Sequence, residues 1–412
     1  MPQRSGTHAP SGTDRLSAET QDTYDASTGG VILLLVVVAL FVLTQLYLAI
    51  PLFSYVGQDF HAAEAAVSLA LATSFSLSYA GGFLVWGPVS DQYGRRPVML
   101  AGLLVLALAT CASAFAPSLP WLAGLRVVQG LAAACFAPIA LAWLAEAMPP
   151  QRRAMAIGAM STAFLVAGIF GQVLAAWVAL HWNWNWVFLT TGICLAISVP
   201  LVARMVQDPP RSQISGHLGH RFVALGSVAM KPAALLLSLA NITLLLSFVA
   251  MYTALGPQLS LLGLDAGKVI MLRLIGLPGM FAALLIGPLA ARLGMRGLAV
   301  AGFLLAAAGL TLEAVLSHSL SGIAIGSLIF VTGVALAVPA MITQFGLLAA
   351  PNRAAGMAIN GFVLFVGASI GPLIAAHIPD FPWLLGGLAA AMALAAFSVA
   401  GSAAGTSKPR GT

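Results

Sequence analysis

The sequence predicts an all-α membrane protein with twelve transmembrane helices. Only 7% of the 412 residues are charged, and the mean hydropathy is +0.98, more than a water-soluble core needs. The apolar runs reach the roughly 20 residues that a helix needs to cross a hydrocarbon layer of about 30 Å. They are also unbroken, unlike the alternating strands of a membrane barrel. Helices, which satisfy their own backbone groups, therefore form the spans.

Twelve apolar runs follow one another along the chain. The first six are expected at 31–54, 66–87, 98–117, 120–147, 154–178 and 185–204. The second six are expected at 233–259, 268–290, 297–317, 320–349, 355–378 and 382–403. These runs predict one six-helix bundle over 30–204, a linker over 205–231 and a second bundle over 232–403.

The polar segments at the two ends are predicted to be cytoplasmic tails. Residues 1–29 contain no apolar run, so they are not expected to be a cleavable signal and are predicted to be disordered. Residues 404–412 form the corresponding short C-terminal tail.

The basic residues divide unequally between the two sets of loops. One set, with the tails, holds fifteen Lys and Arg residues, and the opposite set holds only Lys268. Because cytoplasmic loops retain Lys and Arg, both termini and the linker are predicted to be cytoplasmic in a multi-pass protein of the inner membrane. The net charge of +6 then reflects topology, and no nucleic-acid partner is expected.

No metal site, cofactor site or enzyme active site is predicted. Cys111, Cys135 and Cys194 all lie inside apolar runs without the spacing of metal ligands, so they are expected to be packing residues. The spans bring no His, Ser, Cys or acidic cluster to one depth, which argues against a membrane enzyme. The absence of a P-loop argues against ATP-driven pumping.

Two segments repeat at a spacing of 200 residues. GPVSDQYGRR, from Gly87, aligns with GPLAARLGMR, from Gly287, and GIFGQVLAA, from Gly168, aligns with GASIGPLIAA, from Gly367. The matched positions are Gly87 and Gly287, Pro88 and Pro288, Gly94 and Gly294, Arg96 and Arg296, and Gly171 and Gly371. Six crossings return the chain to its starting side, so the two halves have the same orientation. Parallel repeats of this kind are typical of secondary transporters.

The segment 87–97 resembles the signature loop between the second and third helices of the major facilitator superfamily, G-x-x-x-D-x-x-G-R-R/K-x. The matching residues are Gly87, Asp91, Gly94, Arg95 and Arg96. The resemblance extends over nearly all of 30–403. It implies two six-helix bundles that alternate access to a central site.

The resemblance also implies a cytoplasmic charge latch. In the family, the loop Asp faces the start of the eleventh helix and the first Arg pairs with an acid at the inner end of the fourth helix. Here these groups would be Asp91, the helix that starts near Ala355, Arg95 and Glu146. The alternative is that Arg95 and Arg96 only set topology. The second-half copy has Ala291 and Met295 in place of the Asp and the first Arg, so the latch should depend on the first half.

LRVVQGLAAACFAP, residues 125–138, resembles the family's fourth-helix pattern R-x-x-x-G-x-x-x-A. The resemblance implies that Arg126 takes part in proton coupling or substrate contact. A guanidinium in the membrane costs about 2.5–3.5 kcal/mol at the centre of a span, so an interior position is expected. The alternative is that Arg126 snorkels to the outer interface, which is only about six residues away.

Small residues at every fourth position predict close contacts between helices. Gly171, Gly287 and the Gly371–Pro372 pair are expected at such contacts. The fifth-helix pattern of efflux antiporters, G-x-x-x-G-P-x-x-G-G, is degraded here, because Gln172 follows Gly171 and the paired glycines have become alanines.

Polar side chains inside the spans are the candidates for a substrate route. Gln45, Gln129, Asn241 and Tyr252 are expected to line a weakly polar cavity. Arg273 is a further candidate for the cavity or for coupling. Arg273 and Glu313 fall in the outer parts of their spans and could pair, with a structural pair favoured over a functional one. No acid lies near the middle of helices one, four, five or seven, which favours a neutral or anionic substrate over a cation.

Together these features predict a monomeric secondary transporter in a lipid bilayer. Proton-coupled export of a small molecule, either a drug, a sugar or a metabolite, is the leading hypothesis. A proton-independent uniporter or an importer of the same fold is the alternative.

Overall fold

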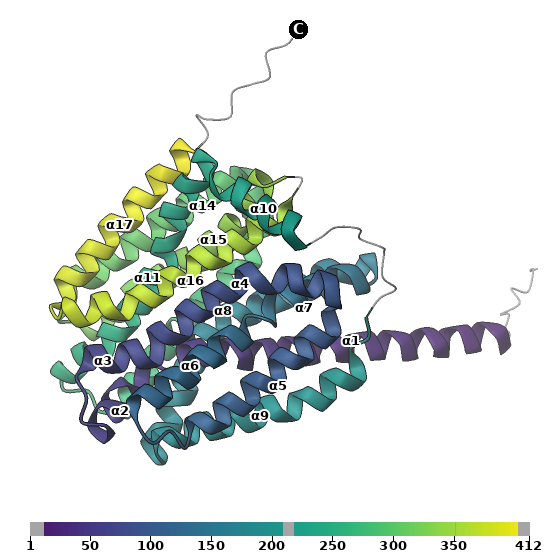
Figure 1. Cartoon of the computed structure of the whole chain (residues 1–412). Coiled ribbons are helices and arrows are strands. Elements are labelled where there is room, and N and C mark those ends of the chain that lie inside the picture. The colour runs from purple at the N-terminus through teal and green to yellow at the C-terminus, as the bar shows by residue number, and fades with distance from the viewer. Residues whose placement is uncertain (1–11, 209–217, 351, 403–412) are drawn as a thin grey trace, which may run out of the picture.

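The computed structural model describes residues 12–208, 218–350 and 352–402, and these residues form helices and short connections without any strand (Figure 1). Eleven hydrophobic helical stretches in this part of the chain are long enough to cross a membrane. The longest, Gly267–Val315, is interrupted at Gly294, where the backbone is not helical. It therefore contains two spans, which gives the twelve that the sequence predicts.

The first half begins with α1 (Gly12–Tyr47), a short 3₁₀ turn (Ile50–Leu52) and α2 (Phe53–Asp59). The second span is built from α3 (Glu64–Ser68), a π-helical turn (Leu69–Thr73) and α4 (Ser74–Tyr93). Then come α5 (Arg95–Ser113), α6 (Leu119–Ala133), α7 (Ala137–Ala147), α8 (Pro150–His181) and α9 (Trp184–Met205).

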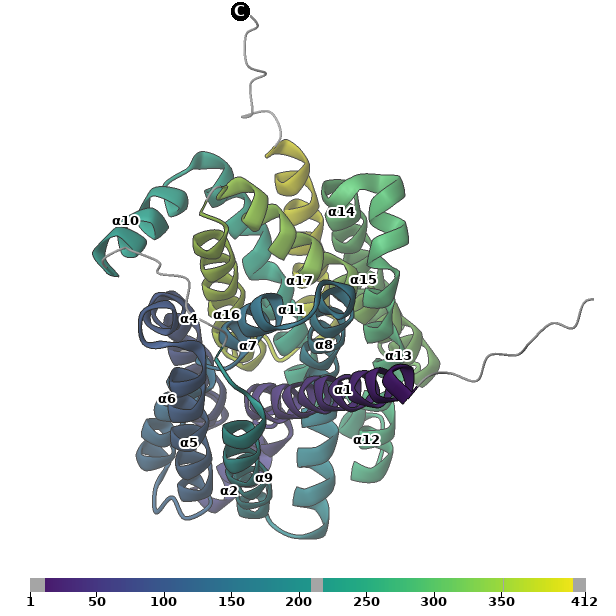
Figure 2. The same ribbon diagram turned by 90° about the vertical axis from the view of Figure 1, so that its right-hand side faces the viewer.

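The second half follows α10 (Leu218–Ala229), which lies beside α4 and α16 (Figure 2). It consists of α11 (Pro232–Leu261), α12 (Ala266–Ile275), α13 (Leu277–Met280), a 3₁₀ turn (Phe281–Leu285), α14 (Ile286–Val315), α15 (Leu320–Leu348), α16 (Arg353–His377) and α17 (Phe381–Gly401). The two halves lie side by side, with α4 and α16 packed against each other between them (Figures 1 and 2).

The polar segments differ in part from the expected tails and linker. Helix α1 starts at Gly12, so residues 12–29 continue the first span as helix instead of forming a disordered tail. No proline lies between Gly12 and Gly29, and adding a residue to an existing helix costs far less than starting one. The linker contains α10. Residues 1–11, 209–217 and 404–412 of the predicted tails and linker lie outside the described residues.

The bundle has two chemically different ends. The basic end carries Arg95, Arg152, Lys231, Arg296 and Arg353, and the tryptophan end carries Trp121, Trp182 and Trp383. Indole rings favour the headgroup layer, and the Trp121, Trp182 and Trp383 side chains are all exposed.

The sequence repeat corresponds to a repeat in backbone conformation. Gly94 has φ 105° and ψ 151°, and Gly294 has φ 68° and ψ 161°. Each residue separates two consecutive spans at the basic end. Residues with a Cβ atom are strained in this region of φ and ψ, so glycine is needed at both positions.

Gly94→Ala is expected to lower the stability of the folded protein by about 1–3 kcal/mol, because alanine is strained at a φ of 105°. The measurement is thermal unfolding of the purified protein in detergent. Gly87→Ala is the matched control: Gly87 is helical and a Cβ atom there meets nothing within 4 Å. This control should be neutral or slightly stabilising. Equal melting temperatures for Gly94→Ala and wild type would contradict the backbone argument.

Equivalent glycines bring the helices of each half close together. A Cβ atom at Gly171 in α8 would lie 3.1 Å from the Thr44 carbonyl oxygen in α1. A Cβ atom at Gly371 in α16 would lie 2.8 Å from the Leu246 carbonyl oxygen in α11. Pro372 is buried beside it within α16. Gly287 has open space around it, so it makes no close helix contact in this conformation.

Candidate functional site

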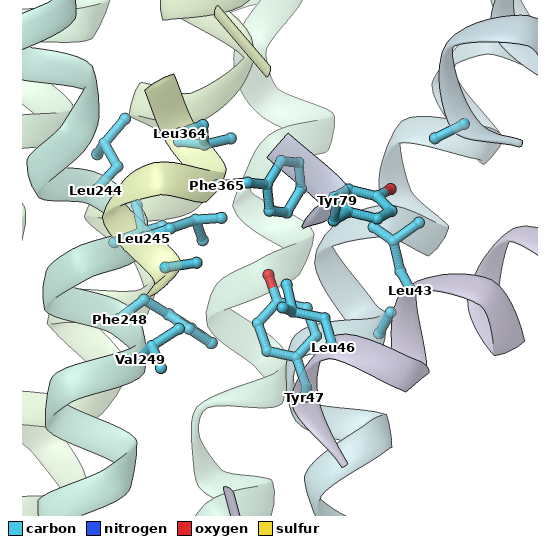
Figure 3. Packing of buried hydrophobic residues seen from close by; sticks show 14 of the residues in the cluster. Leu43, Leu46, Tyr47, Tyr79, Leu244, Leu245, Phe248, Val249, Leu364 and Phe365 are labelled. Carbon is cyan, nitrogen blue, oxygen red and sulfur yellow. The ribbon is translucent and has the colours of Figure 1, made fainter. Parts of the chain in front are cut away.

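The two halves meet at the centre of the molecule through buried aromatic and aliphatic side chains (Figure 3). The rings of Tyr47 in α1 and Phe248 in α11 have centroids 5.7 Å apart, and those of Tyr79 in α4 and Phe365 in α16 are 4.4 Å apart. Both pairs are edge-to-face, the arrangement that aromatic quadrupoles favour. The shared surface is therefore apolar and aromatic.

Two of the predicted polar residues, Gln45 and Asn241, use their side-chain amide donors on backbone carbonyls. The Gln45 side-chain amide donates to Phe41 O at 3.4 Å, and the Asn241 amide donates to Asn360 O at 2.9 Å. The Gln45 and Asn241 side-chain oxygens and the Tyr252 hydroxyl have no hydrogen-bond partner although they are buried. In this conformation these polar atoms are closed to solvent and their hydrogen-bonding capacity is unused.

Arg126 is fully buried in α6. Its guanidinium donates to Leu71 O at 2.7 Å, Gln45 O at 2.7 Å and the Gln129 side-chain oxygen at 2.6 Å. Its Cζ atom lies 4.2 Å from the centre of the Phe75 ring, a cation–π contact. The snorkelling alternative is wrong, because the side chain turns into the bundle and joins the first, second and fourth spans.

Two local features support the Arg126 network. Leu71 lies in the π-helical turn, a rare deviation that is often found at functional sites. Gln129 extends the network to α5, because its amide donates to Ser113 Oγ at 2.6 Å and to Ala109 O at 3.1 Å. Sequence reasoning did not identify Leu71 or Ser113, since a carbonyl acceptor leaves no signal in residue type.

Arg95 forms the centre of a charge cluster at the basic end. Its guanidinium lies 2.7 Å from Asp91 and 2.5 Å from Glu146, and a second bond joins Nε to Glu146 at 3.1 Å. It also donates to Ser90 Oγ at 3.2 Å. The cluster connects the ends of α4 and α7 to the start of α5, with the pairing of Arg95 and Glu146 that the resemblance implies.

Arg96 and the end of the sixth span form a second contact at the basic end. The Arg96 backbone N–H donates to Asp208 Oδ1 at 2.8 Å, and its guanidinium donates to Ala203 O at 2.5 Å. Sequence reasoning did not identify Asp208. Its position just beyond α9, close to the basic loop in space but not in sequence, explains the omission.

Two contacts join the halves in the part of the bundle nearer the tryptophan end. Thr73 Oγ1 donates to Ser369 O at 2.8 Å, which joins the second span to α16. Arg273 in α12 donates to the side-chain oxygen of Gln172 in α8. Thr73 and Arg273 are 200 residues apart, so the pseudo-symmetry relates the two donor residues. Both hold the halves together toward that end.

The expected pair of Arg273 and Glu313 is not formed. Arg273 is bonded to Gln172, and both Glu313 carboxylate oxygens are buried without a partner. Gln172 entered the sequence analysis only as a departure from a motif. A buried arginine needs a hydrogen-bond acceptor. The position of Arg273 inside a span therefore indicated that a polar side chain, such as that of Gln172, lies against it.

No group of three or more His, Cys, Asp or Glu residues in the described part of the chain is arranged to hold a metal ion. The features of this region are thus an aromatic interface between two halves, two buried arginines and a charge cluster at one end.

Comparisons with known proteins agree with this architecture. The sequence profile of the Major Facilitator Superfamily matches residues 35–372. The uncharacterized MFS-type transporter YybF of Bacillus subtilis is 28% identical over 82% of this chain and 84% of its own length. The multi-drug resistance efflux pump PmrA of Streptococcus pneumoniae is 27% identical over 70% of this chain and 73% of its own length. The gallate transporter of Pseudomonas putida is 34% identical over 35% of this chain and 34% of its own length.

A solved structure shares the fold. It is a bacterial homologue of the human lysosomal transporter Spinster, in an inward-facing and unoccupied conformation, with a TM-score of 0.67. The match covers 92% of this chain and 96% of that chain at 18% identity. With the profile match over most of the chain, these findings show that this multi-pass integral membrane protein belongs to the major facilitator superfamily of transporters.

Proposed function

We propose that this transporter exports a small neutral or anionic molecule with apolar or aromatic surface in exchange for protons. The observation that carries the proposal is the aromatic surface between the halves, formed by Tyr47, Tyr79, Phe248 and Phe365 without a charged side chain among them. Such a surface suits apolar rings, and the nearby unpartnered oxygens of Gln45 and Asn241 suit a few polar groups. The similarity to efflux pumps supports the direction.

In this proposal the basic end faces the cytoplasm of a bacterial cell and the protein lies in the inner membrane. The excess of Lys and Arg in the loops at that end supports the orientation. Both termini are then cytoplasmic, and the contacts of Arg273 with Gln172 and of Thr73 with Ser369 close the outer side. The protein would act as a monomer that alternates between this state and one open to the outside.

A pH gradient across proteoliposomes tests the proposal. A tolerance screen of a deletion strain across sugars, amino acids and antimicrobial compounds first identifies a transported compound. We expect an imposed pH gradient to raise its accumulation in vesicles about 10-fold over vesicles treated with a protonophore, because each pH unit is a tenfold proton ratio. If accumulation does not depend on the pH gradient, the proposal of proton exchange is wrong.

Import or uniport of a small aromatic acid is the second candidate. One observation favours it: part of the chain is similar to a transporter of gallate. Uptake of radiolabelled gallate, measured with and without an imposed pH gradient, distinguishes the two. Equilibration without accumulation indicates uniport, and accumulation only against an imposed pH gradient indicates coupled transport.

A further inference from the structure

Arg273 in α12 is a buried arginine that uses few of its hydrogen-bond donors. The residue is 3% exposed, and its Nη1 atom donates to the side-chain oxygen of Gln172 in α8. Its Nε atom is buried without an acceptor, and its Nη2 atom makes no hydrogen bond within the described residues. No acid in the described part of the chain, the buried Glu313 included, forms a salt bridge with it. A buried cation in this state carries a desolvation cost that its own partners do not offset.

Arg126, the other buried arginine of the described residues, shows what a satisfied guanidinium looks like. Its three nitrogens each donate to an acceptor of the protein, which are Leu71 O, the Gln129 side-chain oxygen and Gln45 O. Arg126 therefore has no free edge for a ligand. Arg273 keeps the edge formed by Nε and Nη2 free, so it can accept a further partner.

The free edge of Arg273 lies beside a glycine of α11. A Cβ atom at Gly256 would lie 3.5 Å from Nη2, and because glycine has none, no side chain at this position covers the nitrogen. Tyr252 is four residues earlier in α11 and so lies on the same face of the helix. Its hydroxyl is 2.5 Å from the position that a Cβ atom would take at Gly276, the C-cap of α12. Tyr252 and the free edge of Arg273 thus both lie where α11 meets α12.

The aromatic surface between the halves continues to this place. The ring of Phe248 has its centroid 5.7 Å from that of Tyr47 and 4.8 Å from that of Tyr252 (Figure 3 shows the first pair). A Cβ atom at Gly168 in α8 would lie 3.2 Å from the Phe248 ring. Gly168 is one turn before Gln172, whose amide donates to Gly168 O at 2.7 Å and leaves its oxygen for α12. The aromatic rings therefore lead from the centre of the molecule to the contact of α8 with α12.

The surroundings of Arg273 supply a single positive charge. The helices packed against α12 are α8, α11, α13 and α15, and α11, α13 and α15 contain no charged side chain. The arginines of α8 lie at its start, at the basic end. In α12 itself, Lys268 is exposed and paired with Asp265. One cation balances one negative charge, which favours a carboxylate over a phosphate group of about −1.5 to −2.

We propose that Arg273 binds the anionic group of the transported molecule and that this molecule is an aromatic monocarboxylate, an inference that rests on the proposed transport function and names its substrate class. The parallel N–H groups of the Nε–Nη2 edge match the two oxygens of a carboxylate. The ring of the substrate packs on Tyr47, Phe248 and Tyr252. In the present conformation the bond to Gln172 closes the outer side, so the anion reaches the edge when the halves separate there.

Thermal stabilisation of the purified protein in detergent tests the anion site without any gradient. The probes are benzoate, 4-hydroxybenzoate, gallate and 2-naphthoate, each compared with its uncharged carboxamide at about pH 7, where the acids are ionised. We expect at least one acid to raise the melting temperature more than its amide, because only the anion forms charge-assisted hydrogen bonds with a guanidinium. Its apparent affinity should fall about 10- to 100-fold in Arg273→Gln. No preference for any acid over its amide, or a preference that persists in Arg273→Gln, overturns the inference.

Matched variants separate anion binding from closure of the outer side. Arg273→Gln and Gln172→Leu both remove the bond between the halves, but only the first removes the guanidinium. Gln172→Leu should therefore keep the preference for the acid, and Arg273→Lys should keep a weaker one, since an ammonium has the charge without the paired N–H groups. Arg292→Ala, which removes an exposed arginine at the basic end, should bind as wild type. Loss of the preference in Gln172→Leu as complete as in Arg273→Gln overturns the inference.

Gly256→Leu tests the free edge while Arg273 stays in place, and it keeps the inference testable if Arg273→Gln does not fold. A leucine side chain would fill the space beside Nη2. We expect it to weaken binding of the acid by about 10-fold or more, since one charge-assisted hydrogen bond is lost. Gly256→Ala is the matched control, because its Cβ atom makes only an ordinary contact at 3.5 Å. Equal affinities in Gly256→Leu and Gly256→Ala overturn the assignment of this edge.

The two proposals fail in different ways. If the pH gradient drives flux of the compound found in the tolerance screen but no acid binds through Arg273, the anion site is wrong and proton exchange stands. If the acids bind through Arg273 but flux in wild type ignores the gradient, proton exchange is wrong and the anion site stands.

Discussion

Arg126→Ala is expected to destabilise the protein by about 2–5 kcal/mol, the range for removing one member of a buried hydrogen-bonded charge network. The substitution leaves Leu71 O, Gln45 O and the Gln129 side-chain oxygen without their donor. The first, second and fourth spans would lose the hydrogen bonds through which Arg126 joins them. The measurements are the yield of folded protein after detergent extraction and its melting temperature.

Two further variants separate the hydrogen bonds of Arg126 from its bulk and charge. Arg126→Lys keeps the charge but cannot reach three acceptors in a planar arrangement, so its melting temperature should lie between wild type and Arg126→Ala. Gln45→Leu is the matched control: Arg126 bonds to the Gln45 carbonyl, not to its side chain, so a change of similar volume should cost less than about 1 kcal/mol. An Arg126→Ala protein as stable as wild type contradicts the network.

Arg95→Ala is expected to slow transport by about 10-fold while the protein stays folded, because conformational couplings are typically 1–3 kcal/mol. Arg95 contacts Asp91 and Glu146, whose side chains are 23% and 45% exposed. Partly exposed ion pairs contribute little to the free energy of unfolding. The substitution should therefore mainly change the equilibrium between the transport conformations. The measurement is the initial rate of flux in proteoliposomes of matched protein content.

The second half supplies the control for this prediction. Arg292→Ala removes an exposed arginine from the loop equivalent to 87–96, where Ala291 and Met295 replace the acid and the first arginine. That variant should transport at the wild-type rate. Asp91→Asn should be slower than wild type with its fold intact, since it weakens one of the two pairs of Arg95. A wild-type rate for Arg95→Ala would leave Arg95 with a role in topology alone.

The glycines show how far sequence reasoning reaches into structure. The spacing of 200 residues aligned Gly94 with Gly294, and both adopt the same region of φ and ψ. It also aligned Gly171 with Gly371, and each allows a close approach to the first helix of its own half. The same reasoning predicted a contact at Gly287 that is not made in this conformation. The position of a glycine in the sequence does not show which helix, if any, faces it.

The sequence by itself determined the number of spans and the repeat, and the resemblance to the family implied the Arg95–Glu146 pair. Apolar length and loop charge are local properties, and a repeated motif keeps its positions along the chain. Only the tertiary structure decided which atoms Arg126 and Arg273 meet and that Glu313 has no partner. The physical reason is that these acceptors are backbone carbonyls or amides on distant helices. Their positions depend on how the two halves pack in one conformation, which residue types alone do not encode.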